Sequence, residues 1–323
     1  MAAMKPIQNI PLQGIDFSDD TFSVNFMPDL QRLRMSIEAV GLIQPVLLKK
    51  GKGAYQVVFG FRRIWISKEL SMDQIPAIVF EEGEKSDLEL FTLSLHENLT
   101  SRGFNTVEKA IALQKLTTSF SIPTSEILSI YLPLFSLEPN EKILNTYLAL
   151  AKMEDEIKAY ILKEEVSRFN IRLLAQMSSE DRKVLLHLLT RLKLGENRLR
   201  EILTLLMEIS RRDHKTLREV IDSPELQAIL SREEFTSHQR TERVKRVLLH
   251  LRHPRMRQRE EEFVHRVKTF HLPEGVSLHH SPYFEGKGLK IEFQFESMEE
   301  YRAILSDLNQ LTDKKAFQEL VNV

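Results

Sequence analysis

Two adjacent arginines, Arg62 and Arg63, follow a glycine in the segment VVFGFRRIWISKEL (residues 57–70). The pattern predicts a buried strand, a turn at Gly60 and a helix that begins beside the two arginines. The first turn of a helix leaves backbone N–H groups unpaired, and these attract anions. Guanidinium groups also pair with phosphate oxygens two at a time. The segment therefore predicts a phosphate site, although paired arginines at a helix start are also common on solvated surfaces.

A second polar cluster lies in HENLTSRGFNTVEKA (residues 96–110), where Glu97 and Asn98 are adjacent. A carboxylate and a carboxamide both supply oxygen ligands that suit magnesium. A third segment, GLIQPVLL (residues 41–48), precedes the arginines, and an IPAIVF stretch (residues 75–80) separates them from the acid–amide pair. Each segment alone is common on protein surfaces, but the three together in this order are far more specific.

The elements that must position these residues alternate between strands and helices up to about residue 115. Strands are predicted in KPIQNIPLQGIDF, in QPVLLKKGKGAYQVVFG, which reads as two strands joined by a turn, and in IPAIVF. Apolar residues at helical spacing predict helices in PDLQRLRMSIEAVGL and SDLELFTLSLHEN. Asn105 is predicted to open a further helix, because Glu108 follows three residues later and can reach back to the cap.

The middle of the chain, residues 116–222, is predicted to be helical throughout. The strand pattern disappears there, and short amphipathic stretches follow one another closely. Ser178 and Asp181 form a predicted capping pair at the start of one of these helices. The IDSPEL stretch (residues 221–226) is the predicted linker to the last part of the chain.

The last hundred residues combine a basic helical stretch with a strand. Residues 238–268 carry ten lysines and arginines, and Pro254 is expected to break or kink the helix there. GLKIEFQFE (residues 288–296) alternates strictly between apolar and polar residues, which is typical of a strand. A strand with one following helix exposes most of its apolar face, so this unit must pack on another domain or on a second copy.

Composition excludes several classes of protein and of chemical site. The chain has 323 residues, of which 42% are hydrophobic and 28% charged, and its net charge is −1. Any contact with nucleic acid must therefore come from a local basic patch. The absence of cysteine excludes disulfides, thiolate zinc sites and cysteine nucleophiles. Neither a signal pattern nor an apolar run of about 18 residues is present, so we expect a soluble cytoplasmic protein.

The three N-terminal segments resemble the ParB family over about residues 5–118. The family carries a GxxQP element, a GERRxRA-like box, an IPA strand and an ENLQRxDLNPxEEA box. Here they correspond to GLIQP (residues 41–45), GFRR (residues 60–63), IPA (residues 75–77) and the stretch from Glu97 to Ala110. The chain departs from the family at three positions, where Phe61 replaces the usual glutamate and where Trp65 and Ser101 replace arginines.

The resemblance implies a site for CTP with a magnesium ion. Within the family the nucleotide closes two protomers into a clamp on DNA, and slow hydrolysis resets it, so the nucleotide acts as a switch. The implied nucleotide-binding residues are Gly60, Arg62, Arg63, Asn98 and Arg102. Glu97 and Asn98 are the implied metal ligands, and Gln44 and Glu97 are the catalytic candidates.

The resemblance also implies DNA binding by the helical part. Two sets of residues are candidates for it. One is the face of the second helix of a helix-turn-helix, predicted to expose Lys142, Asn145 and Thr146; the other is a helix start with Arg168, Asn170 and Arg172. The basic residues 238–268 could add contacts to DNA phosphates, or could form a solvated helix face.

The expected fold class is α+β, with four segments. These are a ParB/sulfiredoxin-like nucleotide-binding domain (1–115), a helical domain (116–222), a basic helical linker (223–270) and a strand-helix dimerisation unit (271–323). Implied partners are DNA, a second copy of the chain and a ParA-type ATPase, with a location at the nucleoid. Two alternatives stay open, namely a small-molecule kinase on the same fold and an adaptor whose nucleotide site has decayed. Sulfiredoxin chemistry is excluded because it needs a cysteine.

Overall fold

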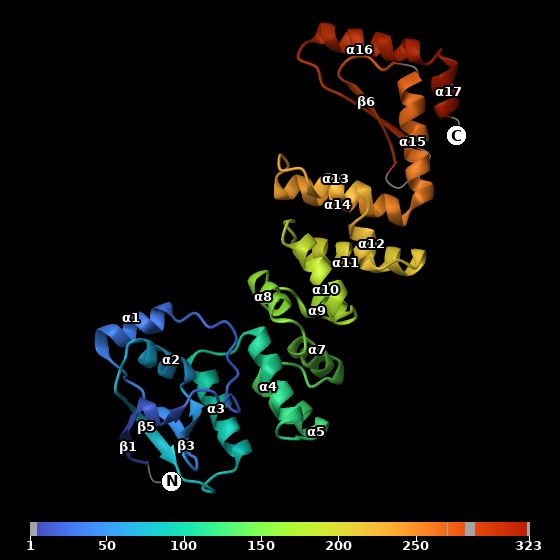
Figure 1. The fold of residues 1–323 in the computed structure, drawn as a ribbon. Coiled ribbons are helices and arrows are strands. Elements are labelled where there is room, and N and C mark those ends of the chain that lie inside the picture. The colour runs from blue at the N-terminus through green and yellow to red at the C-terminus, as the bar shows by residue number, and fades with distance from the viewer. Residues whose placement is uncertain (1–4, 270, 282–287, 322–323) are drawn as a thin grey trace. The chain divides into compact units, whose positions relative to one another are not determined.

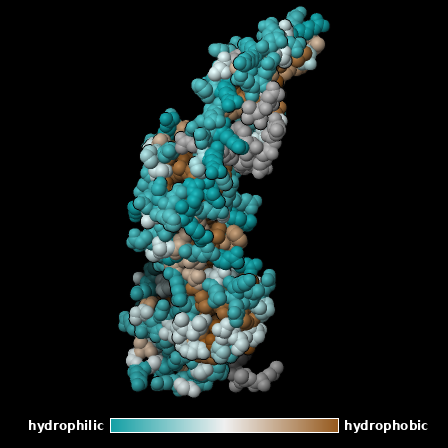
Figure 2. Space-filling view, turned by 90° about the vertical axis from the view of Figure 1, so that its right-hand side faces the viewer, coloured by the Kyte–Doolittle hydropathy of each residue, from teal (hydrophilic) through white to brown (hydrophobic). Residues whose placement is uncertain are grey.

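The computed structural model describes residues 5–269, 271–281 and 288–321. The chain forms two compact units, residues 1–183 and 184–323 (Figure 1). The first contains a mixed sheet with helices, and the second is helical with a small strand pair, which confirms the expected α+β class. The face seen in Figure 2 is mostly hydrophilic, as expected when most of the apolar side chains are buried.

The sheet of the first unit has the strand order β1-β5-β3-β4-β2. Its strands are β1 (Ile7–Pro11), β2 (Ile15–Asp16), β3 (Val46–Lys50), β4 (Tyr55–Phe59) and β5 (Gln74–Phe80). β3 and β4 form the antiparallel hairpin predicted from the sequence, and β5 runs parallel to β3 on its other side. β1 pairs with β5 in an antiparallel register, and the two-residue β2 extends the sheet beyond β4.

Four helices accompany this sheet in the described part of the first unit. They are α1 (Gln31–Val40), α2 (Phe61–Glu69), α3 (Asp87–Ser101) and α4 (Thr106–Thr118). α2 contacts β3 and α3 contacts β4 (Figure 1), and the apolar faces of these elements meet in a core that includes Val46, Leu48 and Ile64. The predicted cap of α4 is confirmed, because Asn105 and Glu108 form a reciprocal capping box.

The remainder of the first unit is helical, as the sequence predicted. It contains a continuous helical stretch made of α5 (Thr124–Glu126), η2 (Ile127–Tyr131) and α6 (Leu132–Leu134), then α7 (Glu141–Ala151), α8 (Asp155–Lys163) and α9 (Arg168–Ala175). α7 packs against both α4 and α9. The predicted capping pair at the start of α10 (Ser179–Leu189) is confirmed, since Asp181 N–H donates to the Ser178 hydroxyl at 3.1 Å.

The second unit begins within α10. It continues with α11 (Glu196–Asp213), α12 (Leu217–Ile221), α13 (Pro224–Leu230), α14 (Ser237–Arg252), α15 (Pro254–Thr269), β6 (Val276–His280), β7 (Leu289–Phe293), α16 (Met298–Leu311) and α17 (Lys315–Val321). The predicted helix break is confirmed, because α14 ends just before Pro254 and α15 begins there. β6 was not predicted, and it pairs antiparallel with β7.

The four-segment division remains a proposal. Residues 221–226, predicted to be a linker, include the end of α12 and the start of α13, and both Ile221 and Leu226 are buried. Residues 1–4, 270, 282–287 and 322–323 of the predicted segments lie outside the described residues. Within the described ranges, none of the helices combines the length and apolarity needed to cross a membrane.

Candidate functional site

The start of α2 is shaped by Gly60, which lies between β4 and the helix. Its φ of 98° is in the left-handed region, and a Cβ there would lie 2.7 Å from Cγ1 of Val46. Only glycine fits such a position without strain. The N–H of Ile64 is bonded to the Gly60 carbonyl at 3.0 Å, so the earlier N–H groups have no partner within the helix. The helix therefore begins with N–H groups that its own carbonyls do not satisfy.

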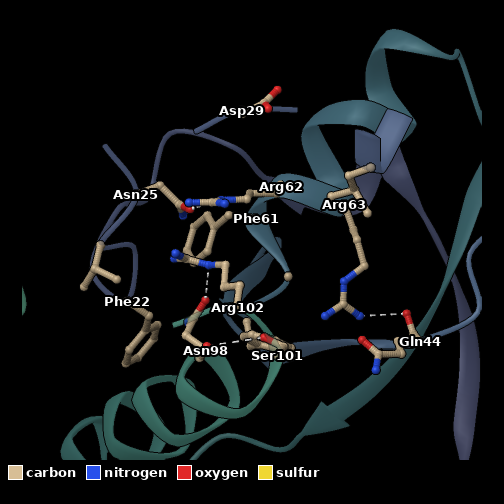
Figure 3. Close-up of a pocket in the computed structure, with 14 residues that line it drawn as sticks. Phe22, Asn25, Asp29, Gln44, Phe61, Arg62, Arg63, Asn98, Ser101 and Arg102 are labelled. Carbon is tan, nitrogen blue, oxygen red and sulfur yellow. Dashed lines mark hydrogen bonds between the residues drawn. The ribbon is translucent and has the colours of Figure 1, made fainter. Parts of the chain in front are cut away.

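A pocket of about 280 Å³ lies at this helix start (Figure 3). Six of the predicted site residues line it, namely Gln44, Gly60, Arg62, Arg63, Asn98 and Arg102. The structure therefore brings together residues from three separated sequence segments. The remaining lining residues are Phe22, Val24, Asn25, Asp29, Leu33, Phe59, Phe61 and Ser101.

Two side chains accept hydrogen bonds from Arg62. Its Nε donates to Oδ1 of Asn25 and its Nη2 to Oε1 of Glu108, both at 2.8 Å. Burial, and next the charge of Arg102, lower the pKa of Arg62, while Glu108 acts in the opposite direction. Arginine nevertheless stays protonated at physiological pH. The pocket therefore holds two positive charges close together, with one buried carboxylate between them.

Arg102 shares that carboxylate. Its Nη1 donates to Oε2 of Glu108 at 2.7 Å, and its Nε donates to Oδ1 of Asn98 at 2.9 Å. Its Nη2 is buried and has no hydrogen-bond partner among the described residues. A buried charged donor without an acceptor is costly, and this nitrogen is also closed to solvent.

Arg63 points to another side of the pocket, toward Gln44 (Figure 3). Its Nη1 donates to the backbone carbonyls of Gln44 at 2.8 Å and Pro45 at 2.9 Å, and its guanidinium lies over the ring of Phe59. Burial lowers the pKa of Arg63, and the charge of Glu97 partly offsets this. Arg63 thus fixes the chain that leads into β3, besides lining the pocket.

The predicted metal ligands do not form a metal site by themselves. Glu97 is exposed and is not among the lining residues, and Oδ1 of Asn98 already accepts from the Arg102 guanidinium. In the described residues, no three histidine or acidic side chains gather where a metal ion could be held. Magnesium binding by Glu97 and Asn98 therefore stays a prediction, since magnesium is commonly held by one or two protein ligands together with substrate phosphates.

Sequence reasoning missed the second role of Glu108. Its position three residues after Asn105 identified it as a capping residue, and this assignment is confirmed. The spacing carries no information about Arg62, which lies on another helix. Asn25 and Asp29 were missed as well, because they come from an irregular stretch before α1 that has no motif.

The candidate DNA-binding residues divide into exposed and buried ones. Lys142 and Asn145 on α7 are exposed, whereas the expectation that Thr146 is exposed is wrong. Thr146 is only 9% exposed, and its hydroxyl donates to the Lys142 carbonyl at 2.8 Å.

The second set, on α9, divides in the same way. Arg168 and Arg172 are exposed at and after the start of the helix, while Asn170 is fully buried. A buried side chain cannot reach a base edge, so only the exposed members of both sets remain candidates for DNA contacts.

Part of the basic stretch 238–268 is engaged within the second unit. Lys245 pairs with Glu201 at 2.9 Å and Arg252 with Glu208 at 2.7 Å. Arg240 donates to backbone carbonyls, including that of Arg232 at 3.0 Å. These three cations of the stretch are therefore engaged within the protein, and a contact of the stretch with DNA phosphates stays a prediction.

Comparisons with known proteins agree with the motifs. The ParB N-terminal domain family matches residues 2–99. Nucleoid occlusion proteins of Bacillus thuringiensis and Bacillus anthracis are 26% identical over 179 residues, which is 54% of this chain and 58% of theirs. The protein of that name from Oceanobacillus iheyensis is 27% identical over 157 residues, which is 48% of this chain and 52% of its own. The chain thus spans little more than half the length of these curated relatives.

Solved structures of the same group are also similar in part. One is C-terminally truncated ParB of Caulobacter crescentus with CTP-gamma-S, at 22% identity and a TM-score of 0.27, covering 54% of this chain and 94% of that one. The same protein with the centromeric parS site has 16% identity and a TM-score of 0.35, covering 66% and 95%. A Pnob8-like ParB-N domain has 14% identity and a TM-score of 0.35, covering 81% and 99%.

Proposed function

Because the chain belongs to the ParB family through its N-terminal domain, we propose that it is a nucleotide-switched DNA-binding protein that acts in chromosome or plasmid partitioning. The pocket at the start of α2 binds the phosphates of the nucleotide. CTP is the nucleotide that the family motifs imply. Slow hydrolysis, if this chain performs it, would reset the switch.

The observation that carries this proposal is the convergence of anion-binding groups in one pocket. The start of α2, whose first N–H groups have no partner within the helix, lines the pocket together with the guanidinium groups of Arg62 and Arg102. A phosphate chain would supply acceptors to all of these donors at once. Phe22 and Phe61 also line the pocket, but both side chains are buried, so they offer little accessible apolar surface to the rest of a nucleotide.

Isothermal titration of the protein with CTP, ATP, GTP and UTP tests the nucleotide proposal. We expect saturable binding of CTP and weaker binding of the other three. Equal affinities for all four nucleotides would still indicate a phosphate-binding site but would contradict the assignment to CTP. The absence of heat with every nucleotide would reject the proposal and favour an adaptor whose site has decayed.

We also propose that exposed residues of α7 and α9 contact DNA. Lys142 and Asn145 lie on α7, and Arg168 and Arg172 on α9, a helix that packs against α7. Cationic side chains on neighbouring helices give a local positive surface although the net charge of the chain is −1.

Fluorescence anisotropy with random-sequence duplex DNA tests this surface. Each of Lys142→Ala and Arg168→Ala should weaken binding and reduce the slope of log K against log salt by about one, because each removes about one phosphate contact. Lys163→Ala is the matched control, since this lysine at the end of α8 is 83% exposed and lies outside the proposed set. If both variants keep the wild-type slope of log K against log salt, α7 and α9 do not contact DNA.

The C-terminal strand pair and α16 are proposed to form a dimer with a second copy of the chain. The rings of Phe293, Phe295 and Tyr301 cluster there, with centroids of Phe295 and Tyr301 4.8 Å apart. Phe295 is 49% exposed, and Met298, three residues later, is 61% exposed. Exposed apolar side chains such as Phe295 and Met298, next to partly buried rings, are typical of a surface covered on assembly.

A further inference from the structure

Glu108 on α4 is the most deeply buried charged group at the pocket. It is 1% exposed, whereas the side chains of its two arginine partners, Arg62 and Arg102, are 21% and 20% exposed. An ionised carboxylate accepts hydrogen bonds at both oxygens, and here each oxygen takes one guanidinium. The group therefore lies behind the two arginines, on the side away from solvent.

The capping role of Glu108 does not explain this arrangement. Its Oε2 accepts from the N–H of Asn105 at 3.2 Å, which completes the capping box of α4. A cap needs a single acceptor, and glutamine serves at this position as well as glutamate. Glu108 accepts two further hydrogen bonds that the cap does not require. Nη2 of Arg62 donates to Oε1, and Nη1 of Arg102 donates to Oε2.

We propose that Glu108 is a positioning residue for nucleotide binding, which holds the guanidiniums of Arg62 and Arg102 at the wall of the pocket, where their charges attract the phosphates. The inference rests on the proposed function and deepens it. Two guanidiniums this close repel each other, and without the carboxylate each would turn toward solvent. With the carboxylate in place, both guanidiniums are held among the residues that line the pocket.

This role also explains how an arginine reaches the pocket although position 101 is a serine. Ser101 stands there, and the adjacent Arg102 reaches the pocket instead. Its guanidinium is fixed by three acceptors, namely Oδ1 of Asn98, Oε2 of Glu108 and the backbone carbonyl of Gly103. Because the arginine is shifted by one position, its orientation depends on these partners rather than on its place in the motif.

A double-mutant cycle between Glu108→Gln and Arg102→Ala tests the proposal, with CTP affinity measured by isothermal titration. In the wild-type background Arg102→Ala should weaken binding by about tenfold or more. In the Glu108→Gln background the same change should cost less than about threefold, because Arg102 is no longer oriented. Equal losses in the two backgrounds would overturn the proposal, since a residue that only stabilises the fold gives an additive cycle.

The matched control is Asn105→Ala, which removes the cap of α4 and leaves both arginine contacts of Glu108 in place. It should lower the melting temperature while the cost of Arg102→Ala remains at its wild-type value. If Asn105→Ala abolishes that cost as Glu108→Gln does, the effect belongs to helix stability and the positioning role is rejected.

A measurement on the wild type covers the case in which Glu108→Gln does not fold. Nitrogen NMR of the nucleotide-free protein should show separate Nη signals for Arg62 and Arg102, because the carboxylate restricts guanidinium rotation. Averaged signals for both side chains would overturn the proposal. If the wild type binds none of the nucleotides, the proposed function is wrong. If it binds CTP and the double-mutant cycle is additive, only the role of Glu108 is wrong.

Discussion

At the scale of single residues, the pocket depends on a position that only glycine can occupy. The left-handed backbone at Gly60 turns the chain from β4 into α2, so that Arg62 and Arg63 enter the first turn of the helix. Any side chain at this position would meet Val46, whose Cβ lies 3.0 Å from the site of a new Cβ. The turn therefore couples the packing of the sheet to the placement of the arginines.

Gly60→Ala should destabilise the protein by about 1–3 kcal/mol, because a left-handed backbone at a non-glycine residue is strained. The contact with the Val46 side chain adds to this cost. Urea unfolding measures the change. Gly53→Ala is the matched control, since an added Cβ there would have no atom within 4 Å and the residue does not have a left-handed φ. If both variants unfold at the same urea concentration, the backbone at position 60 does not require glycine.

At the scale of elements, an ion pair holds the start of α10 to the start of α8. Arg182 binds Glu154 with two hydrogen bonds, Nε to Oε2 and Nη2 to Oε1, both at 2.8 Å. The side chains are only 12% and 17% exposed. Arg182 Nη1 also donates to the Met177 carbonyl at 2.6 Å, so the same guanidinium ties down the chain between α9 and α10.

This ion pair predicts a pH dependence of stability. The hydrogen bonds from Arg182 lower the pKa of Glu154 from 4.5 to about 2. A group with a depressed folded-state pKa stabilises the protein above its unfolded-state pKa, and that contribution is lost as the pH falls from 4.5 toward 2.

Glu154→Gln should therefore cost about 1.5–3 kcal/mol at pH 7, as expected for hydrogen bonds between charged groups. The difference from the wild type should shrink as the pH falls below 4.5. Urea unfolding at pH 7 and at pH 3 measures it. A difference that stays constant across this range would contradict the assignment.

Much of the fold at this scale could be predicted from the sequence, since local patterns suffice for it. The β3–β4 hairpin, the capping box of α4 and the helix break at Pro254 all follow from residues that are close in the chain. β6 was missed because VSLHH is short and partly polar, and its pairing with β7 is not a local property.

Contacts between distant parts of the chain were also missed at the pocket. Motif spacing placed Arg62, Asn98 and Arg102 together, whereas the links between them through Glu108 depend on how two helices pack. The exposure of Thr146 was wrong for a related reason. Its hydroxyl bonds back to the carbonyl of Lys142, and its side of α7 faces the protein interior.

At the scale of the whole molecule, the C-terminal aromatic cluster predicts the assembly state. Analytical ultracentrifugation should find the wild type as a dimer and Phe295→Glu shifted toward monomer, because a charge would be buried in the interface. Ile130→Glu is the control, since Ile130 is an exposed apolar residue of the first unit at 55% exposure. A monomeric wild type, or a dimer that survives Phe295→Glu, would contradict the proposed interface.

The switch proposed for the whole molecule requires that the nucleotide engage the guanidiniums of the α2 pocket. The most direct test is isothermal titration of CTP into the wild type and into Arg62→Ala under the same conditions. The account predicts that the variant loses about 1.5–3 kcal/mol of binding free energy, which corresponds to a loss of about ten- to 150-fold in affinity. Equal affinities of the two proteins for CTP would contradict it.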